Sequence, residues 1–341
     1  MAAMQHSFAH FTRRHLIGSG LAAMASVPLA HAAEPAPALT LQIKPDRELM
    51  VPVEGGRLYV RVNGDLDGPR LPLVYLHGGP GSGHAGLLAL TALAQERAII
   101  LYDQLDSGRS DAPADPRNWR VERFVDEIDA VRRALGVERW HLGGGSWGGT
   151  LALEYGARRP AALASLIIQS PLVSTRSWIA DANVLRSELP GQWRATLDAC
   201  ESPVPPSAEQ CAAADDAYLS RHVWRTPGDP RIAAYRAGMP PHAGEAVYNG
   251  MWGPVEFRAT GTLRDYNGEP LLTRLDGRRA LFVAGEYDEA RPATVAAFAR
   301  RVPGAQFRTI RGAAHAILRD APASYLPVIS AWCRRHEAAR A

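Results

Sequence analysis

The fold of this chain is decided by the stretch Trp140-His141-Leu142-Gly143-Gly144-Gly145-Ser146-Trp147-Gly148-Gly149. An apolar strand runs here into a turn crowded with glycines, and a helix-forming run from Thr150 to Arg159 follows. The turn carries the G-x-S-x-G pattern of a nucleophile elbow at Gly144 to Gly148. Glycines let the backbone turn tightly enough to expose a side-chain hydroxyl. Ser146 is therefore the candidate nucleophile.

Two other interpretations fit the same letters. The spacing Gly143-x-Gly145-x-x-Gly148 also matches a dinucleotide-binding fingerprint, which requires an acidic residue about 20 positions on, at the end of the next strand. The next predicted strand, residues 163–170, ends in Gln169 and Ser170 and has no carboxylate there. A glycine-rich turn without chemistry is the other alternative, and the rest of the chain has to discriminate among the three.

The first 33 residues have the features of an export signal. Thr12-Arg13-Arg14-His15-Leu16-Ile17 is a twin-arginine pattern, and a mildly apolar stretch from Ile17 to Ala30 follows it. Ala30-His31-Ala32 fits a small-residue cleavage site. The apolar stretch is too short and too weak to span a bilayer stably. We expect a bacterial protein exported already folded to the periplasm or beyond; a disordered tail with a chance Arg-Arg is the alternative.

Removal of this segment leaves a nearly neutral chain. The whole sequence has 38 Lys and Arg against 35 Asp and Glu, a formal net charge of +3. The segment contains two of the basic residues, Arg13 and Arg14, and no acidic one, so 36 basic residues remain against 35 acidic ones. No basic field for nucleic acid survives. We expect no nucleic-acid partner and, once the signal is removed, no membrane partner; the sequence does not indicate the oligomeric state.

The mature chain alternates strands and helices. Residues 34–48 are interpreted as a leader, and residues 49–63 as an antiparallel hairpin at a sheet edge. Further strands are predicted at 71–76, 98–102, 140–145, 163–170, 279–285 and 306–310, with helices at 84–96, 121–135, 150–159, 292–301 and 322–336. This order predicts an α/β fold with a mostly parallel sheet and helices on both faces, formed by residues 49–172 and 276–341.

The alternation breaks between residues 173 and 275. This stretch contains helical fragments rich in Trp, Pro and Arg and no buried strand. An insertion between two strands of a sheet passes over the rim of that sheet. We therefore predict a mostly helical lid above Ser146, which can exclude water and shape a pocket.

Chemistry at Ser146 requires two partners. A serine hydroxyl is a weak nucleophile near neutral pH and needs a base, which a carboxylate in turn orients. In the hydrolase fold these residues follow in the order serine, acid, histidine. Asp288 comes just after the predicted strand 279–285, and His315 just after the predicted strand 306–310. Both are expected at the rim where Ser146 emerges, and this agreement favours the elbow over the other two interpretations.

Other residues compete for these two roles. Asp103 is an alternative acid, but it follows the wrong strand. His77, His84 and His141 are alternative bases. His77 precedes a glycine loop and His141 lies inside a strand, positions that more often serve structure than proton transfer. Asp288 and His315 therefore remain the preferred pair.

The developing charge of an acyl-transfer reaction needs an oxyanion hole. Its backbone N–H groups come from the residue after the serine and from the loop after an earlier strand, and these positions are held by Trp147 and Gly79. The spacing of His and Cys does not resemble a zinc site, and no H-E-x-x-H is present. We expect neither a metal nor an organic cofactor.

Several motifs together resemble the proline iminopeptidase family of α/β-hydrolases, which includes the tricorn-interacting aminopeptidases. They are His77-Gly78-Gly79-Pro80-Gly81, Asp103-Gln104 with Gly108-Arg109-Ser110, Gly144-Gly145-Ser146-Trp147-Gly148-Gly149, Gly285-Glu286-Tyr287-Asp288-Glu289, Gly253-Pro254-Val255-Glu256-Phe257 and Thr260-Gly261-Thr262. The likeness runs from about Leu49 to the end of the chain. It implies the α/β-hydrolase fold and a serine aminopeptidase.

The resemblance also implies a substrate anchor. In that family the positions of Glu256 and Glu289 bind the free α-amino group of the substrate, and Tyr248 matches a pocket tyrosine. An ammonium beside the scissile bond needs charge-assisted acceptors, worth about 1.5 to 3 kcal/mol each. The alternatives are that Glu256 is a solvated loop carboxylate and that Glu289 forms a salt bridge with Arg291.

One residue departs from the family pattern. Asp106 stands where the family has glycine in its Asp-Gln-x-Gly-x-Gly stretch. Aspartate tolerates a left-handed backbone better than most residues, so we expect the loop to survive. We also expect this extra carboxylate near the pocket, where it could alter the substrate preference.

The cysteines indicate a disulfide. Cys200 and Cys211 bracket the proline-rich loop 201–210, and an oxidising compartment permits a bond between them, worth about 2 to 3 kcal/mol. Cys333 on the last predicted helix is expected to be a buried free thiol.

Together these features predict an exported serine aminopeptidase. It would release N-terminal proline or another small apolar residue from short peptides or aminoacyl amides through an acyl-enzyme. An amino-acid amidase or esterase on the same scaffold is the alternative, and a non-enzymatic small-molecule binder is a third possibility.

Overall fold

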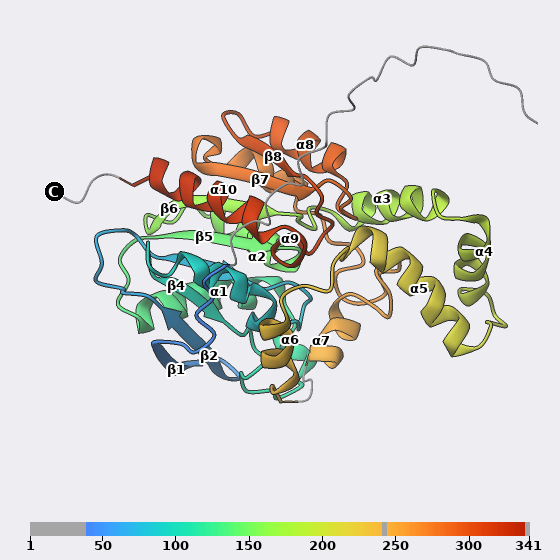
Figure 1. Ribbon diagram of the computed structural model, residues 1–341, viewed down its shortest axis with the longest axis horizontal. Helices are drawn as coiled ribbons and strands as arrows, with labels where there is room; N and C mark the ends of the chain where they lie inside the picture. Colours follow the sequence, from blue (N-terminus) through green and yellow to red (C-terminus); the bar gives the residue numbers. More distant parts are fainter. Residues whose placement is uncertain (1–38, 241–243, 338–341) are drawn as a thin grey trace, which may run out of the picture. The chain divides into compact units, whose positions relative to one another are not determined.

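The computed structural model describes residues 39–240 and 244–337 (Figure 1). The predicted export signal, residues 1–33, lies outside the described residues, as do residues 34–38 of the predicted leader. Within the described ranges no helix combines the length and the apolar character that crossing a bilayer requires.

An eight-stranded sheet forms the centre, in the order β1-β2-β4-β3-β5-β6-β7-β8. The strands are β1 (Arg47–Val53), β2 (Gly56–Asn63), β3 (Leu73–Leu76), β4 (Ile99–Tyr102), β5 (Trp140–Gly145), β6 (Leu163–Gln169), β7 (Ala280–Gly285) and β8 (Gln306–Ile310). Only β1 with β2 and β2 with β4 pair antiparallel. The predicted edge hairpin and the predicted α/β fold class are therefore confirmed.

Apolar side chains cover both faces of the sheet, because successive residues of a strand point to opposite sides. On β3, Val74 and Leu76 belong to one hydrophobic cluster and Leu73 and Tyr75 to the other. The first cluster takes up side chains of α1 (Val121–Ala134), α2 (Trp147–Ala157) and α8 (Pro292–Arg300). The second takes up side chains of η1 (His84–Leu93), α9 (Ile317–Asp320) and α10 (Pro322–Arg335). Short 3₁₀ turns are η2 (Pro116–Asn118), η3 (Glu269–Arg274) and η4 (Gly277–Arg279).

One core helix differs in type from the prediction. The segment expected as a helix over 84–96 is a 3₁₀ helix that ends at Leu93. Its C-terminal turn is closed by bonds between residues three apart, from the Ala94 N–H to the Thr91 carbonyl and from the Glu96 N–H to the Leu93 carbonyl. Nearly all of its side chains are buried, so packing rather than an amphipathic pattern determines its form.

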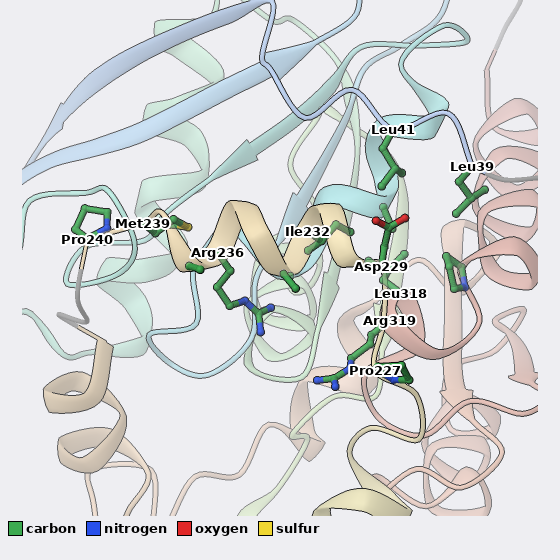
Figure 2. A pocket seen from close by; sticks show the side chains of 16 residues that line it. Leu39, Leu41, Pro227, Asp229, Ile232, Arg236, Met239, Pro240, Leu318 and Arg319 are labelled. Carbon is green, nitrogen blue, oxygen red and sulfur yellow. The ribbon is translucent and has the colours of Figure 1, made fainter.

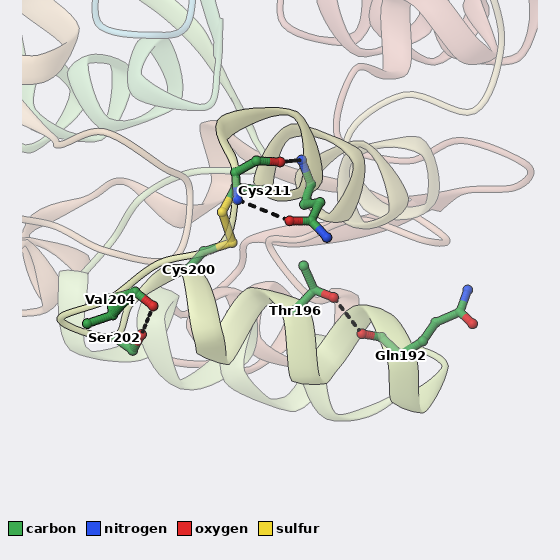
Figure 3. The surroundings of a disulfide bond; sticks show 8 residues. Gln192, Thr196, Cys200, Ser202, Val204 and Cys211 are labelled. Atoms are coloured by element: carbon green, nitrogen blue, oxygen red, sulfur yellow. Dashed lines mark hydrogen bonds between the residues drawn. A yellow bond between two sulfur atoms is a disulfide. The ribbon is translucent and has the colours of Figure 1, made fainter.

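The stretch between β6 and β7 forms the helices α3 (Thr175–Ser187), α4 (Gly191–Cys200), α5 (Ala208–His222), α6 (Pro230–Ala237) and α7 (Gly244–Met251). We call residues 170–279 the insertion. Its α3, α4 and α5 share a hydrophobic cluster of their own, which includes Leu185, Leu197 and Tyr218. The helices α4 and α5 are joined by a disulfide between Cys200 and Cys211, whose Cα atoms are 5.9 Å apart (Figure 3). Cys333 is a buried free thiol.

Candidate active site

Ser146 occupies the sharp turn between β5 and α2. Its backbone is left-handed, with φ 58° and ψ −124°, a strained conformation for a residue other than glycine. The flanking glycines allow close packing. A Cβ on Gly144 would lie 2.0 Å from the Gly148 carbonyl oxygen, and a Cβ on Gly148 would lie 2.3 Å from the Leu76 carbonyl oxygen. The strand can turn directly into the helix only because both positions lack a side chain, and this turn holds the serine at the rim of the sheet.

Asp288 lies just beyond the end of β7 and is held by four hydrogen bonds. Its Oδ1 accepts from His315 Nδ1 at 2.8 Å and from the Ala290 N–H at 2.9 Å. Its Oδ2 accepts from the Ser170 hydroxyl at 2.6 Å and from the Gly285 N–H at 2.9 Å. The carboxylate is buried and its lone pairs are occupied, so it fixes the orientation of the imidazole.

His315 lies between the core and the insertion. Its backbone N–H donates to the His222 carbonyl at the end of α5, at 3.1 Å. The Trp178 ring meets the imidazole edge to face, with centroids 5.6 Å apart. Its Nε2 lies 3.8 Å from Glu289 Oε1. Within the described residues the Ser146 hydroxyl has no hydrogen bond to this nitrogen.

The charge state of His315 is set by opposing effects. Burial lowers the pKa of the imidazole, but the charge of Asp288, the charge of Glu289 and the hydrogen bond that the ring donates to Asp288 raise it, and the charge of Glu256 raises it further. The net result raises the pKa of His315 to about 9. The imidazole is therefore largely protonated near neutral pH in the free protein.

Two backbone N–H groups flank the serine. Neither the Gly79 N–H nor the Trp147 N–H has an acceptor in the described part of the chain. Gln104 ties the two loops together, because its side-chain oxygen accepts from Trp147 Nε1 at 2.8 Å and its amide donates to the His77 carbonyl at 3.0 Å. Gln104 belongs to the Asp103-Gln104 motif, but the sequence did not indicate that its side chain joins these two loops. Such a pair of free donors can stabilise an oxyanion.

Two further carboxylates flank the serine and the histidine. Glu256 follows α7, and its Oε1 accepts from the Tyr248 hydroxyl at 2.8 Å. Glu289 is 2% exposed, and its Oε2 has no hydrogen-bond partner among the described residues. Burial raises the pKa of the Glu256 carboxyl, and burial together with the charge of Glu256 raises the pKa of Glu289 well above its usual range. Arg291 pairs with Asp181 at 3.3 Å, so it is not engaged by Glu289.

A small cavity lies beside Ser146 and Glu256. Its lining residues come from the core loops and from the insertion and are Gly79, Pro80, Ser146, Trp147, Leu172, Trp178, Tyr248, Trp252, Glu256 and Leu263. Its volume of about 20 Å³ is enough for about one water molecule. The walls are mainly aromatic and aliphatic, with one carboxylate, so the cavity suits a small apolar group that carries a positive charge.

A larger cavity of about 660 Å³ lies elsewhere, along α6 and α9 (Figure 2). Its walls are mostly apolar, with the charged side chains of Asp229, Arg236 and Arg319, and it shares no lining residue with the cavity at Ser146. No serine, cysteine or histidine lines it within the described residues. The candidate chemistry is therefore confined to the smaller cavity.

The competing histidines serve structural contacts. His84 is paired with Asp103, as discussed below. His77 Nδ1 bonds to the Gly78 carbonyl at 2.8 Å, and burial lowers the pKa of this imidazole. His141 is buried in β5, where its Nδ1 contacts the Ser165 hydroxyl at 2.8 Å. None of the three lines the cavity at Ser146.

Asp106 does not lie where the sequence analysis expected it. Its backbone is left-handed, with φ 61°, as the loop requires. Its carboxylate faces away from the small cavity, because Oδ1 accepts from the Ala114 N–H at 2.7 Å and Oδ2 from Trp119 Nε1 at 2.9 Å. Asp106 does not line the cavity. These two hydrogen bonds give the carboxylate a role in loop structure instead of in selecting the substrate.

Sequence reasoning missed two contributors. Ser170 donates to Asp288 from the end of β6, and the buried Tyr218 hydroxyl of α5 is close enough to Glu289 for the negative charge to raise the pKa of the tyrosine. The position of Ser170 could have been predicted, because it follows the strand after the elbow and so lies at the same rim of the sheet. The position of Tyr218 could not, since it depends on how α5 packs.

Residues 72–205 match the family model described as alpha/beta hydrolase fold. With the elbow and the parallel sheet, this makes the chain an α/β hydrolase. It is 35% identical to the proline iminopeptidase of Heyndrickxia coagulans over 83% of this chain and 96% of that protein. The chain belongs to the proline iminopeptidase family, and the predicted resemblance is confirmed. It is a serine hydrolase of the aminopeptidase type.

Solved structures give the same result. The crystal structure of the Mycobacterium smegmatis proline iminopeptidase has a TM-score of 0.77 and 34% sequence identity, and the match covers 85% of this chain and 98% of that one. The crystal structure of VinJ has a TM-score of 0.79 and 33% identity, with 86% and 100% covered. The likeness therefore extends over the insertion as well as the core.

Proposed function

We propose that this protein is an exported aminopeptidase that releases N-terminal proline or another small apolar residue from short peptides or aminoacyl amides. One observation carries the proposal. Glu256, which lines the cavity at Ser146, and the buried Glu289, which lies 3.8 Å from His315 Nε2, form no ion pair with a described lysine or arginine. Such carboxylates suit a substrate that brings its own positive charge to the scissile bond.

The reaction would proceed through an acyl-enzyme. Ser146 Oγ attacks the carbonyl carbon of the first residue and its proton passes to His315 Nε2, while the Gly79 and Trp147 N–H groups receive the oxyanion. The imidazolium then protonates the departing amine as the C–N bond breaks. Water, deprotonated by His315, attacks the ester and releases the first residue with its carboxylate. Asp288 holds the imidazole in orientation throughout.

The cavity supports a small first residue. Its aromatic walls, Trp178, Trp252 and Tyr248, leave about 20 Å³ beside Ser146. Any aminoacyl side chain has to displace part of this wall, and a compact side chain displaces least. Chromogenic amides of proline, alanine and leucine test this proposal. We expect kcat/KM to fall from the compact side chains to leucine, and the reverse order would contradict it.

Blocking the amine tests the carboxylate anchor. We expect N-acetylation of a good aminoacyl amide to lower kcat/KM by at least about tenfold to a hundredfold, the value of one to two lost charge-assisted hydrogen bonds. Equal kcat/KM for free and blocked substrates would remove the role proposed for Glu256 and Glu289. It would favour the alternative, an amidase or esterase that does not require the amine.

A serine-directed phosphonate separates an enzyme from a binding protein. We expect covalent labelling at Ser146, detected by mass spectrometry of the peptide, and loss of labelling in His315→Ala. Ser107, which is buried in the loop after β4, provides a control residue that should stay unmodified. A protein that folds normally and is not labelled would support the small-molecule binder instead.

Export rests on the twin-arginine pattern at Arg13 and Arg14. We propose cleavage at the Ala30-His31-Ala32 site, which removes residues 1–33, and a periplasmic or secreted mature protein. Replacing both arginines by lysine should retain the full-length precursor in the cytoplasm, as measured by fractionation and N-terminal sequencing. Normal processing of the lysine variant would overturn this part of the proposal. The Cys200–Cys211 disulfide is consistent with an oxidising compartment.

A further inference from the structure

The imidazole of His315 faces a carboxylate in the free protein. Its Nε2, the nitrogen that must accept the serine proton, is 3.8 Å from Glu289 Oε1. The other oxygen of this buried carboxylate, Oε2, has no hydrogen-bond partner among the described residues. The hydroxyl of Ser146 is likewise not bonded to Nε2 in this part of the chain. Nε2 therefore lies against the Glu289 carboxyl group and, among the described residues, has no hydrogen bond to the nucleophile.

The charged groups around this imidazole are mostly acidic. Asp288 and Glu289 face it from the loop after β7, and Glu256 faces it from the insertion. From the end of α5, the His222 carbonyl accepts the backbone N–H of His315, and the His222 ring bonds to the Tyr287 carbonyl at 3.1 Å.

Two neighbouring elements add no cation to this group. From α9, Asp320 accepts the backbone N–H of Ala314 at 2.9 Å, and from α3, Trp178 adds an uncharged ring. Among the described residues, the imidazole is the one cation that forms an ion pair with Asp288 or Glu289.

We propose that the α-ammonium group of the substrate replaces the protonated imidazole as the counterion of Glu289, and that this exchange frees His315 Nε2 to accept the proton of Ser146. This inference rests on the proposed function, because it takes Glu256 and Glu289 as the amine anchor. It adds that the amine also activates the base. No bond to carbon changes in this step: the N–H bond at Nε2 breaks and the proton leaves to bulk water.

The exchange has a physical cause. An ammonium donates hydrogen bonds to carboxylates. Glu256 lines the cavity at Ser146, and Glu289 Oε2, near the Tyr218 hydroxyl, has no hydrogen bond of normal geometry among the described residues. The new positive charge repels the imidazolium and neutralises the anions that stabilised it, and both effects lower the pKa of His315. A substrate without an amine leaves the imidazole protonated. Such a substrate would lose turnover as well as binding, and would recover turnover in alkaline solution.

The test compares pH profiles for an aminoacyl anilide and its deaminated isostere, for example alanyl and propionyl p-nitroanilide. The profile of kcat reports the enzyme–substrate complex, and that of kcat/KM reports the free enzyme. We expect the acid limb of kcat for the alanyl substrate to lie at least about one pH unit below the limb for the propionyl substrate. Acid limbs of kcat at the same pH for both substrates would contradict the proposed exchange of the counterion of Glu289. Equal kcat/KM for the two substrates would instead contradict the proposed function itself, so the two failures are distinguishable.

Proton release provides a second measurement. In Ser146→Ala, calorimetric titration with prolinamide in two buffers of different ionisation enthalpy should show release of about one proton per bound ligand near pH 7.5. In the double variant Ser146→Ala, His315→Gln the release should disappear. Persistence in the double variant would assign the proton to a carboxylic acid and overturn the proposal, and so would the absence of release in the single variant.

Glu289→Gln removes the proposed counterion with little change in shape. The acid limb of kcat/KM should then move down by about one to two pH units, because an opposite charge within a few ångströms has been lost. Glu286→Gln is the matched control. Glu286 is exposed in the same loop, where its Oε2 accepts the Gly312 N–H at 2.8 Å, so this variant should leave the limb in place. An unmoved limb in Glu289→Gln would contradict the proposal.

Discussion

The described part of the molecule contains two pairs of a histidine with a buried aspartate. In one of them the histidine, His315, contacts Trp178, which lines the cavity at Ser146. In both, a histidine Nδ1 bonds to an aspartate oxygen at 2.8 Å, as His84 does with Asp103 and His315 with Asp288. The pairs differ at the other nitrogen. His84 Nε2 bonds to the Tyr235 hydroxyl at 2.8 Å, whereas His315 Nε2 faces Glu289.

The difference shows that a hydrogen bond between an aspartate and a histidine does not by itself provide a catalytic base. The side chains of His84 and Asp103 are both 0% exposed, whereas that of His315 is 11% exposed. Asp103 also accepts the N–H groups of His84 and Arg109, at 2.6 and 2.7 Å. The first pair therefore joins two loops, and both of its ends are occupied. In the second pair the other nitrogen, Nε2, lies 3.8 Å from Glu289 Oε1 and has no hydrogen bond among the described residues.

The largest expected effect separates the two histidines. His315→Gln should lower turnover by about 10⁶-fold with little change in folding, because the base is lost. His84→Gln should leave turnover nearly unchanged at temperatures where the protein is folded, and should cost about 0.5 to 3 kcal/mol of stability. Single-turnover kinetics and urea unfolding measure the two quantities. A large loss of turnover in a folded His84→Gln would mean that the pairs are not functionally distinct.

Replacing the two aspartates should also distinguish the pairs, but with a smaller loss of turnover than replacing the histidines. Asp288→Asn should lower turnover by about 10⁴-fold, the effect known for the corresponding change in a serine protease, since the imidazole would take the wrong tautomer. Asp103→Asn should lower the unfolding temperature and keep turnover. Equal turnover losses in the two variants would contradict this assignment.

Removing a carboxylate near His315 should have a third and smaller effect on activity. Glu256→Gln should lower kcat/KM for aminoacyl substrates by about tenfold to a hundredfold, the value of one charge-assisted hydrogen bond, and should leave N-blocked substrates nearly unaffected. Glu48→Gln is a control in the other region, because Glu48 accepts from the Tyr59 hydroxyl near the first pair. A similar loss in both variants would show that the anchor had been misassigned.

The contributions of the two pairs to stability should be lost on opposite sides of neutral pH. His315 has a folded-state pKa of about 9 against an ordinary value of 6.5, so its contribution is complete below pH 6.5 and is lost as the pH rises through about 9. Burial raises the pKa of Asp103, but the hydrogen bond and charge of His84 outweigh it, and the net pKa lies below 3.8. Its contribution is therefore complete above pH 3.8 and is lost as the pH falls through the lowered pKa.

Urea unfolding across the pH range tests both signs. The stability difference between wild type and His315→Gln should shrink in alkaline solution, and that between wild type and Asp103→Asn should shrink in acid. A difference that changes in the opposite direction would contradict the charge states assigned to the pairs.

Much of the site could be predicted because it lies at the ends of strands. Ser146, Asp288 and His315 each follow a strand of the parallel part of the sheet, and parallel strands bring such positions to one rim. The surroundings could not be predicted in this way. Glu256 and Tyr218 come from the insertion, whose helices pack through a separate cluster that no periodicity in the sequence specifies.

Asp106 shows the limit of motif reasoning. Its backbone conformation followed from its place in a glycine-rich loop, but the direction of its carboxylate did not. That direction depends on Trp119 and on the Ala114 N–H, which lie 13 and 8 residues away.

The sequence by itself determined the order of strands and helices, the elbow at Ser146 and which acid and base could follow it, because these depend on local patterns and on the geometry of parallel sheets. Only the tertiary structure decided which aspartate–histidine pair keeps an available nitrogen, and which anion that nitrogen faces. The physical reason is that the pKa of His315 depends on the burial of its ring and on the charges of Asp288, Glu289 and Glu256. The burial of the ring and the place of Glu256 depend on how the insertion packs on the core, which residue spacing does not encode.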